Sequence, residues 1–299
     1  MANTATNNKV LVLGASGYVG KATLAALTSR HGNDKVQVFA GVRKPEKFTD
    51  MPNVTTIQAD MGDKAALTKT LQDQAFDSVF VVVPGHEDRT QLGINAIEAA
   101  KAAGTKFVLM LSVLTCGTDT IFGRQFEGIE DTMKSSGVDH AIVRLPLFID
   151  NNYAQAGSIK GEASTFYDPR DPTKLHTPVA VGDVGKAAAD ILASPAKHIG
   201  KVYKLVSPAF SVNDMAAAFT KTLKKEVKPT TVPYQAAKEA FMGMGFLEWQ
   251  VDGIMELYHY IDDESEITNE PNVGDVELIT GEKATTIGAW VEQNAAGFQ

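Results

Sequence analysis

Apolar and polar positions form two alternating patterns in the first half of the chain. Continuous apolar runs of strand length alternate with segments in which apolar residues recur at helical spacing. The predicted strands cover 10–13, 36–42, 54–59, 78–83, 106–111 and 140–144. The predicted helices cover 18–29, 91–103 and 125–136. Because a parallel connection between strands needs a crossover helix, this alternation predicts an α/β protein with a doubly wound parallel sheet.

The alternation of predicted strands and helices changes after residue 152. Residues 168–172 are loop-like. The pattern of 179–192 predicts a helix and that of 202–206 predicts an edge strand, and with both segments the chain returns to the first domain. Asp183 is expected to cap that helix, and Ser211 with Asp214 has the spacing of a capping box. We therefore expect one domain from 1–150 plus about 180–207, and a smaller, mostly helical C-terminal domain from 151–179 plus 208–299. This smaller domain is expected to face the substrate or a partner.

Composition narrows the classes of partner. The formal net charge is −8 and no basic cluster is present, so direct binding of nucleic acid is not expected. Cys116 is the only cysteine, which excludes an intrachain disulfide, and no His, Cys or carboxylate pair has the spacing of metal ligands. No apolar run is long enough to span a membrane, and residues 1–8 lack the segments of a signal peptide. We expect a cytoplasmic protein, for which a nuclear role stays open.

A glycine-rich turn follows the first predicted strand and opens the first helix. It contains Gly14, Ser16, Gly17, Tyr18, Val19 and Gly20. Glycines allow a tight turn and close approach of a pyrophosphate, to which the helix N-terminus offers free N–H groups and a positive dipole end. Ser16 adds a hydroxyl donor. The turn predicts a dinucleotide site of the Rossmann type, and the alternative is a tight strand–helix turn without a ligand.

The end of the second strand distinguishes NAD from NADP. An NAD site places a carboxylate there to bind the ribose hydroxyls, but this chain has Arg43 and Lys44 instead. The planar guanidinium of Arg43 suits a 2′-phosphate, and Lys44 adds a point charge. We therefore expect NADP(H), and the alternative is a solvated pair of loop cations.

These residues together resemble the atypical short-chain dehydrogenase/reductase proteins. The resemblance rests on the glycine spacing, on Arg43 and on residues 58–63, which read Gln-Ala-Asp-Met-Gly-Asp. Residues 144–151 and 181–188 narrow it to the NmrA-like group, and it extends over nearly the whole chain. It implies an NADP-binding Rossmann domain, a small helical lobe and a cleft between them.

The resemblance also implies roles for residues at strand ends. Asp60 would accept a hydrogen bond from the adenine amino group, and Met61 would pack beside that ring. Further residues would border the cofactor, mostly near the nicotinamide: Val83, Pro84, Ser112, Pro146, Leu147 and Phe148. The alternative for each is ordinary packing. His86, Arg124 and His176 are weaker candidates for ligand contact, and residues 241–260 are expected to form core, with a pocket wall or partner groove as the alternative.

The pair of residues that carries catalysis in the wider superfamily is missing. A tyrosine and, four residues later, a lysine are expected there, but Phe122 and Phe126 stand at these positions. No tyrosine occurs between Tyr18 and Tyr153, so the absence does not depend on the alignment register. A phenyl ring has no proton to transfer and no charge. No catalytic residue is therefore predicted.

Two main functional hypotheses remain. The favoured one is a redox sensor or negative regulator of transcription, which binds NADPH or NADP⁺ and acts through a protein partner. It is favoured because the position of the acid is apolar. The alternative is an NADPH-dependent reductase of quinones or related carbonyl compounds, small molecules whose reduction needs no strong acid from the protein. A third class, a module with a vestigial site, would bind no cofactor.

Overall fold

A single parallel sheet forms the centre of the molecule. The computed structural model describes residues 8–32, 35–271 and 273–299, and within them the sheet has seven strands in the order β3-β2-β1-β4-β5-β6-β8. The strands are β1 (Asn8–Leu13), β2 (Val36–Val42), β3 (Val54–Gln58), β4 (Ser78–Val81), β5 (Phe107–Val113), β6 (Asp139–Leu145) and β8 (Val202–Lys204). All six pairings between neighbours are parallel. The predicted doubly wound parallel sheet is confirmed.

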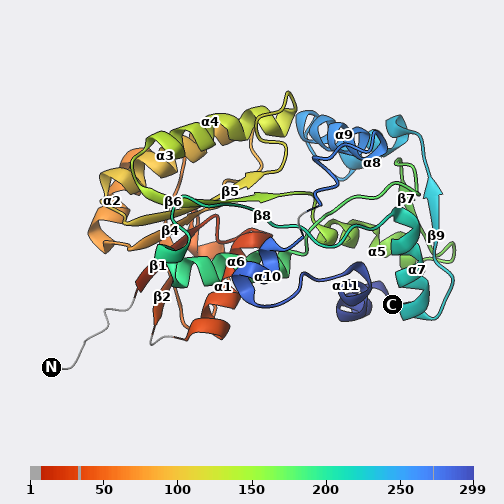
Figure 1. Cartoon of the computed structure of the whole chain (residues 1–299), viewed down its shortest axis with the longest axis horizontal. Coiled ribbons are helices and arrows are strands. Elements are labelled where there is room, and N and C mark those ends of the chain that lie inside the picture. Colours follow the sequence, from red (N-terminus) through yellow and green to blue (C-terminus); the bar gives the residue numbers. More distant parts are fainter. Residues whose placement is uncertain (1–7, 33–34, 272) are drawn as a thin grey trace.

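Helices cover both faces of this sheet (Figure 1). One face carries α2 (Lys64–Gln74), α3 (Arg89–Ala102) and α4 (Ile121–Ser135). The other carries α1 (Tyr18–His31), α6 (Val181–Ala193) and α10 (Asp275–Thr280). The strand order reverses between β1 and β4, and at such a switch point the carboxyl ends of the strands leave a crevice for a ligand.

The central strands are buried on both faces, as their continuous apolar runs predict. All four residues of β4 and the last four of β1 are buried, whereas β8 at the edge alternates exposed and buried residues. The fourth strand ends at Val81, two residues earlier than predicted. Helix α2 was not expected: only Leu67 and Leu71 are buried on it, so its apolar pattern is weak, and Asp63 caps it by accepting from the Ala66 N–H.

The C-terminal part is mostly helical, as predicted, and also contains a small sheet. Its elements are η2 (Ile149–Gln155), α5 (Ala156–Lys160), α7 (Val212–Leu223), α8 (Tyr234–Gly243), α9 (Glu248–Asp262), α11 (Ile287–Asn294) and η4 (Ala295–Phe298). Strands β7 (Thr165–Asp168) and β9 (Lys228–Thr231) pair in parallel, which the sequence did not indicate. A separate apolar core of this part includes Phe166, Phe219 and Trp290, and the division into two domains stays a prediction.

The start of α6 is fixed by a different residue than predicted. Asp150 accepts a hydrogen bond from the Val181 N–H at 2.8 Å. Asp183 lies inside the helix and instead accepts from the N–H and hydroxyl of Thr285, at 2.6 and 3.0 Å. The expected capping role of Asp183 is wrong because the helix begins at Val181 rather than after Asp183. The capping box of Ser211 and Asp214 is present at the start of α7.

Among the helices of the described residues, none combines the length and the apolar character that crossing a bilayer requires.

Candidate functional site

A large cavity runs along the carboxyl ends of the strands, between the sheet and the C-terminal helices. Its volume is about 1250 Å³. Pockets for one drug-sized ligand measure about 300–1000 Å³, so this cavity exceeds the needs of one such molecule. Most of the predicted site residues line it: Gly14, Ser16, Gly17, Tyr18, Val19, Arg43, Lys44, Asp60, Met61, Val83, Pro84, Ser112, Phe122, Phe126, Pro146, Leu147 and Phe148. Gly20 is the exception.

The three glycines of the turn serve different purposes. Gly14 has φ +72°, and a Cβ there would lie 2.2 Å from the Val82 carbonyl oxygen. A Cβ on Gly20 would lie 2.4 Å from the Gly14 oxygen, so Gly20 permits close packing of the turn and does not reach the cavity. Gly17 has φ −78° and no such clash. Gly14 and Gly20 therefore shape the turn, whereas Gly17 keeps the cavity open above it.

The start of α1 is suited to an anion. Gly17 is the N-cap, no side chain caps the helix, and its first turn contains no acidic residue. The first N–H groups of a helix have no intrahelical partner and carry the positive end of its dipole. Tyr18 and Val19 line the cavity at this point, and the Tyr18 side chain is 82% exposed. The turn fits a pyrophosphate.

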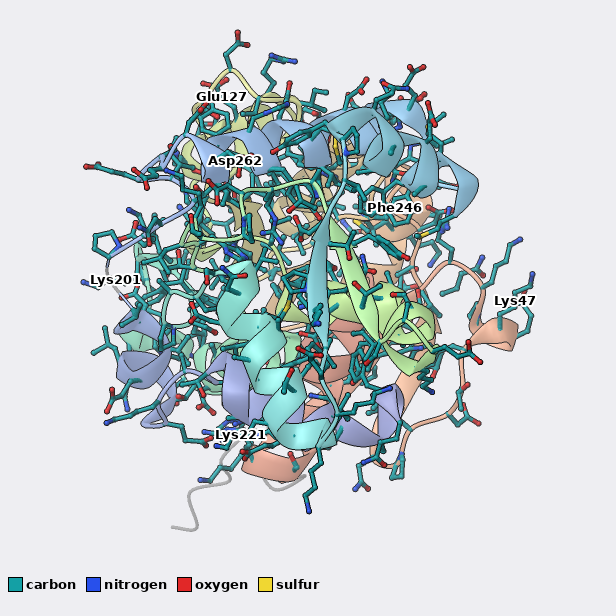
Figure 2. The ribbon with its side chains drawn as sticks, turned by 90° about the vertical axis from the view of Figure 1, so that its right-hand side faces the viewer. Lys47, Glu127, Lys201, Lys221, Phe246 and Asp262 are labelled. Atoms are coloured by element: carbon teal, nitrogen blue, oxygen red, sulfur yellow. The ribbon has the colours of Figure 1, made fainter. Side chains whose placement is uncertain are left out.

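Three cations lie beyond the end of β2. Arg43, Lys44 and Lys47 are exposed and line the cavity, and none forms an ion pair with another described residue. Lys47 belongs to the short helix η1 (Pro45–Lys47), and Figure 2 shows its side chain projecting from the edge of the molecule. The sequence reasoning missed Lys47. Its signal was a third cation one turn after Arg43.

Asp60 and Met61 follow β3 on the same wall. One carboxylate oxygen of Asp60 accepts from the Gly62 N–H at 2.8 Å, which fixes the side chain. Met61 is buried, and its carbonyl accepts from the Asn95 amide at 2.9 Å. Their expected contact with adenine stays a prediction, and the geometry is compatible with it.

Ser112 is held by a buried charge cluster. It is fully buried at the end of β5, and its hydroxyl donates to a Glu130 carboxylate oxygen at 2.6 Å. Glu130 also accepts from Arg144 at 2.9 and 2.7 Å and from Lys134 at 2.9 Å. Ser112 therefore lies beside the cavity as expected, but its hydroxyl is committed to Glu130.

Glu130 is an anion of fixed charge. Burial alone would raise its pKa, but the hydrogen bonds from Arg144, Ser112 and Lys134 outweigh burial and lower the pKa to about 2. Burial, together with Glu130, raises the pKa of the Cys116 thiol to about 11. Neither group exchanges protons near neutral pH. The sequence reasoning did not single out Glu130, although a glutamate on the buried face of α4 was a signal.

Phe122 and Phe126 bring an unexpected cation into the cavity. Both rings line it from α4, and the guanidinium carbon of Arg89 lies 5.5 and 5.1 Å from their centroids. Arg89 also lies 5.8 Å from the Trp249 ring. Burial lowers the pKa of Arg89 to about 10, so the side chain stays charged at neutral pH. The sequence reasoning missed Arg89, whose signal was its position at the start of α3 after the Pro84-Gly85 stop.

Helix α9 forms the opposite wall. A Cβ on Gly253 would lie 2.7 Å from the Phe122 ring, so this glycine allows α9 to pack directly on α4. Glu256 of α9 accepts from the Ile121 N–H at the start of α4, at 2.7 Å. Side chains from this region face the cavity: Phe246, Ile254, Leu257 and Ile261. The apolar segment 241–260 therefore contributes to the pocket wall as well as to the core.

The weaker candidates for ligand contact, His86, His176 and Arg124, differ in whether they reach the cavity. His86 and His176 line the cavity. His176 is buried, its Nε2 accepts from Arg170 at 3.0 Å, and burial and Arg170 hold its pKa well below the usual value. Arg124 is exposed and paired with Asp119, and it does not line the cavity. Within the part of the chain that the structure describes, no group of three or more His, Cys, Asp or Glu side chains could hold a metal ion.

Comparison with known proteins identifies the family. The model of the NmrA-like family matches residues 6–291. The chain belongs to the NmrA-like family. The resemblance predicted from the motifs is thereby confirmed, and the cavity at the strand ends is a feature of an NmrA-like protein.

Relatives of the NmrA-like chain include reductases, and a solved regulator shares its fold. It is 28% identical to an NAD(P)H azoreductase of Xenophilus azovorans, over 97% of this chain and 99% of the relative. It is 31% identical to quinone oxidoreductase 2 of Escherichia coli strain K12, over 77% of this chain and 78% of the relative. Among solved structures, an NADPH-dependent quinone oxidoreductase of Escherichia coli complexed with NADPH matches with a TM-score of 0.80 and 25% identity, over 95% and 99% of the two chains. NmrA, a negative transcriptional regulator crystallised with NAD, matches with a TM-score of 0.76 over 98% of each chain, but at 15% identity this likeness concerns the fold alone.

Proposed function

We propose that the protein binds NADP(H) and uses it to reduce quinones or related acceptors. The observation that carries this proposal is the extent of the cavity. It extends from the glycine turn and the cations that follow β2 to apolar side chains of α9, so apolar lining suited to an acceptor lies beyond the residues assigned to the phosphates. The two reductases named above are relatives over most of their length, which supports the same choice.

Different residues would bind different parts of NADP(H). The N–H groups at the start of α1 and the Ser16 hydroxyl would bind the pyrophosphate. Arg43, with Lys44 and Lys47, would bind the 2′-phosphate by charge-assisted hydrogen bonds. Asp60 and Met61 would hold the adenine. NADPH supplies a hydride when bound, and the apolar wall from α9 would exclude water from the acceptor compartment.

The reductase proposal is tested by NADPH oxidation. We expect steady loss of NADPH absorbance at 340 nm, a wavelength set by the dihydronicotinamide itself, with at least one member of a panel of quinones and azo compounds. Phe122→Tyr should leave this turnover within about threefold, because quinone reduction needs no acid from the protein. No turnover with any acceptor, in a protein that binds NADPH, would refute the reductase proposal.

The cofactor preference is tested at Arg43. We expect Arg43→Glu to weaken NADPH binding by about 10- to 100-fold, because a charge-assisted hydrogen bond is worth about 1.5–3 kcal/mol, and to leave NADH binding nearly unchanged. Isothermal titration calorimetry with both nucleotides measures this. The matched control is Lys101→Glu, the same reversal of charge at an exposed residue of α3 outside the cavity. Equal loss of affinity for both nucleotides would contradict the proposal.

A redox sensor is the second candidate function. It is favoured by Phe122 and Phe126, which leave the tyrosine and lysine positions without a titratable group, and by the likeness of fold to NmrA. A sensor should discriminate between NADPH and NADP⁺ and reduce neither quinones nor azo compounds. Calorimetry with both redox forms, beside the turnover assay, separates the two candidates: similar affinities for NADPH and NADP⁺ would count against the sensor.

A further inference from the structure

The arginines of the chain fall into two groups. Four form ion pairs with carboxylates at N···O distances of 2.5–2.8 Å: Arg30, Arg124, Arg144 and Arg170. The other two, Arg43 and Arg89, have no ion pair with any residue that the structure describes, and both line the same cavity. Arg43 is explained by the proposed 2′-phosphate. Arg89 is left without a counter-ion.

The surroundings of Arg89 make an anionic ligand favourable. Its guanidinium lies among the rings of Phe122, Phe126 and Trp249, so it is largely shielded from water. A buried charge without a counter-ion is costly, and an anion that reaches it is bound in a medium of low dielectric constant. Nearby Asp88 does not compensate the charge, because its side chain is 75% exposed to water and forms no ion pair with Arg89.

The hydrogen bonds of Arg89 orient it and leave donors free. Its Nε donates to the Pro84 carbonyl at 3.1 Å, and its Nη1 donates to the Gln125 side-chain oxygen at 3.0 Å. Within residues 8–32, 35–271 and 273–299, Nη2 has no hydrogen-bond partner. The buried hydroxyl of Thr115, on the same cavity wall, also has none. The guanidinium of Arg89 is thus fixed in place, and its Nη2 is available to donate a hydrogen bond to a ligand.

We propose that Arg89 forms an oxyanion-binding subsite of the cavity, which binds an oxygen atom of the acceptor and stabilises negative charge as it develops there. The acceptor class is a planar conjugated molecule whose reduction leaves charge on oxygen, as that of a quinone does. The flat rings around Arg89 suit such a planar molecule. This inference rests on the proposed reductase function and adds the substrate-binding group to it.

The chemical step balances without an acid from the protein. When a quinone takes a hydride from NADPH, the C4–H bond of the dihydronicotinamide breaks and an O–H bond forms on one quinone oxygen. The two electrons of the hydride reduce the quinone to a hydroquinone monoanion, and NADP⁺ remains. Arg89 stabilises the negative charge on the other oxygen, and a proton from water then completes the hydroquinone.

Equilibrium binding tests the subsite without turnover. The probe is a hydroxynaphthoquinone, whose ionised form differs from its neutral form in visible absorption, and the protein carries NADP⁺, which has no hydride to donate. The neutral control is the same naphthoquinone without the hydroxyl group. The variants are Arg89→Met and Arg89→Lys, and the matched control is Arg124→Met, at an arginine outside the cavity. NADP⁺ affinity is measured for each.

The expected result is specific to charge. Arg89→Met should weaken binding of the ionised probe by about 10- to 100-fold, the worth of one charge-assisted hydrogen bond, while Arg89→Lys loses less because it keeps the charge without the planar fork. The neutral probe and NADP⁺ should change less than about threefold, as expected where no charged contact is lost. The pKa of the bound hydroxyl should lie below its value in water in the wild type and return toward that value in Arg89→Met.

Three outcomes would overturn the subsite. Unchanged binding of the ionised probe would show that Arg89 does not contact the acceptor. Equal loss of both probes would indicate a structural role, and loss of NADP⁺ alone a cofactor contact. If Arg89→Met does not fold, Arg89→Lys carries the test. Turnover is measured separately. Charge-specific binding of the probe without NADPH oxidation would refute the reductase function but keep the anion site at Arg89. NADPH oxidation with unchanged probe binding in Arg89→Met would keep the reductase function and refute the anion site.

Discussion

At the scale of single residues, pairing decides which polar groups are free to act. Ser112 lines the cavity and, with Glu130, resembles an acid–base pair in isolation, yet its hydroxyl is bound to Glu130, and Glu130 is bound to Arg144. Arg89 lies among aromatic rings, where an apolar contact would be expected, yet it carries an uncompensated charge. Residue type alone therefore misleads here in both directions.

At this scale we expect the contribution of Glu130 to the free energy of unfolding to depend on pH. Its pKa, about 2 in the folded protein, lies below the value of about 4.3 expected in an unfolded chain, so its stabilising contribution is complete above about pH 4.3 and is lost as the pH falls toward 2. Glu130→Gln should reduce the free energy of unfolding by about 3 kcal/mol at pH 7, because it leaves Arg144 unpaired beside the core. The reduction should shrink toward pH 2–3.

Urea denaturation at several pH values measures this difference. The control is Glu127→Gln on the same helix, whose side chain is exposed and projects from the surface in Figure 2. Surface substitutions change stability by about 0.5 kcal/mol or less. A Glu130→Gln loss that is the same at pH 3 as at pH 7 would contradict the assignment of Glu130 as an ionised partner of Arg144.

At the scale of elements, small residues set how closely helices pack around the cavity. Gly253 lets α9 contact Phe122 of α4, and Gly185 lets α6 contact α1. A Cβ on Gly185 would lie 2.6 Å from the Ala22 backbone. Since α1 presents its N-terminus to the cavity, the contact between α6 and α1 also supports the phosphate site.

We therefore expect Gly185→Ala to destabilise the fold. Alanine improves helix propensity by about 1 kcal/mol, but forcing α6 away from α1 costs about 1–3 kcal/mol, so we expect a net loss of about 1 kcal/mol. The matched control is Gly182→Ala on the same helix, where a Cβ would meet nothing within 4 Å and the propensity gain should appear alone. Thermal unfolding of both variants measures the difference. Equal melting temperatures for the two would show that α6 has room to move.

At the scale of the whole molecule, the cavity exists because two parts of the chain meet. Strand ends supply one wall, and α9 with the segment around His176 supplies the other. A ligand that fills such a cavity contacts both walls and should stabilise the folded chain, because it binds the native state and not the unfolded one.

NADPH should therefore raise the melting temperature. At a free concentration of about 100 times Kd the stabilisation is about 2.7 kcal/mol, which corresponds to a shift of about 5 °C for a chain of this size. NADH at the same concentration should produce a smaller shift. Differential scanning fluorimetry measures both. An unchanged melting temperature at saturating NADPH would mean that the cavity does not hold the dinucleotide.

The parallel sheet and the glycine-rich turn could be predicted from the amino-acid sequence without coordinates. Buried parallel strands such as 10–13 must be apolar on both faces, and Gly14 has a φ of +72° directly after the first strand, a local backbone conformation that favours glycine. These features are visible because their causes are local or periodic. Arg43 likewise stands out in the sequence at a strand end, and its binding of a 2′-phosphate stays a prediction. The absence of a tyrosine between Tyr18 and Tyr153 needed no structure at all.

Which charged side chains are paired became known from the folded molecule. Glu130 meets Ser112 and Arg144 from neighbouring strands, and Asp183 meets Thr285 across 102 positions, so that it does not cap α6. Arg89 became visible as an unpaired cation only when the rings of α4 and α9 closed around it. Pairing and desolvation depend on distances between residues far apart in the chain, and these distances exist only in the folded molecule.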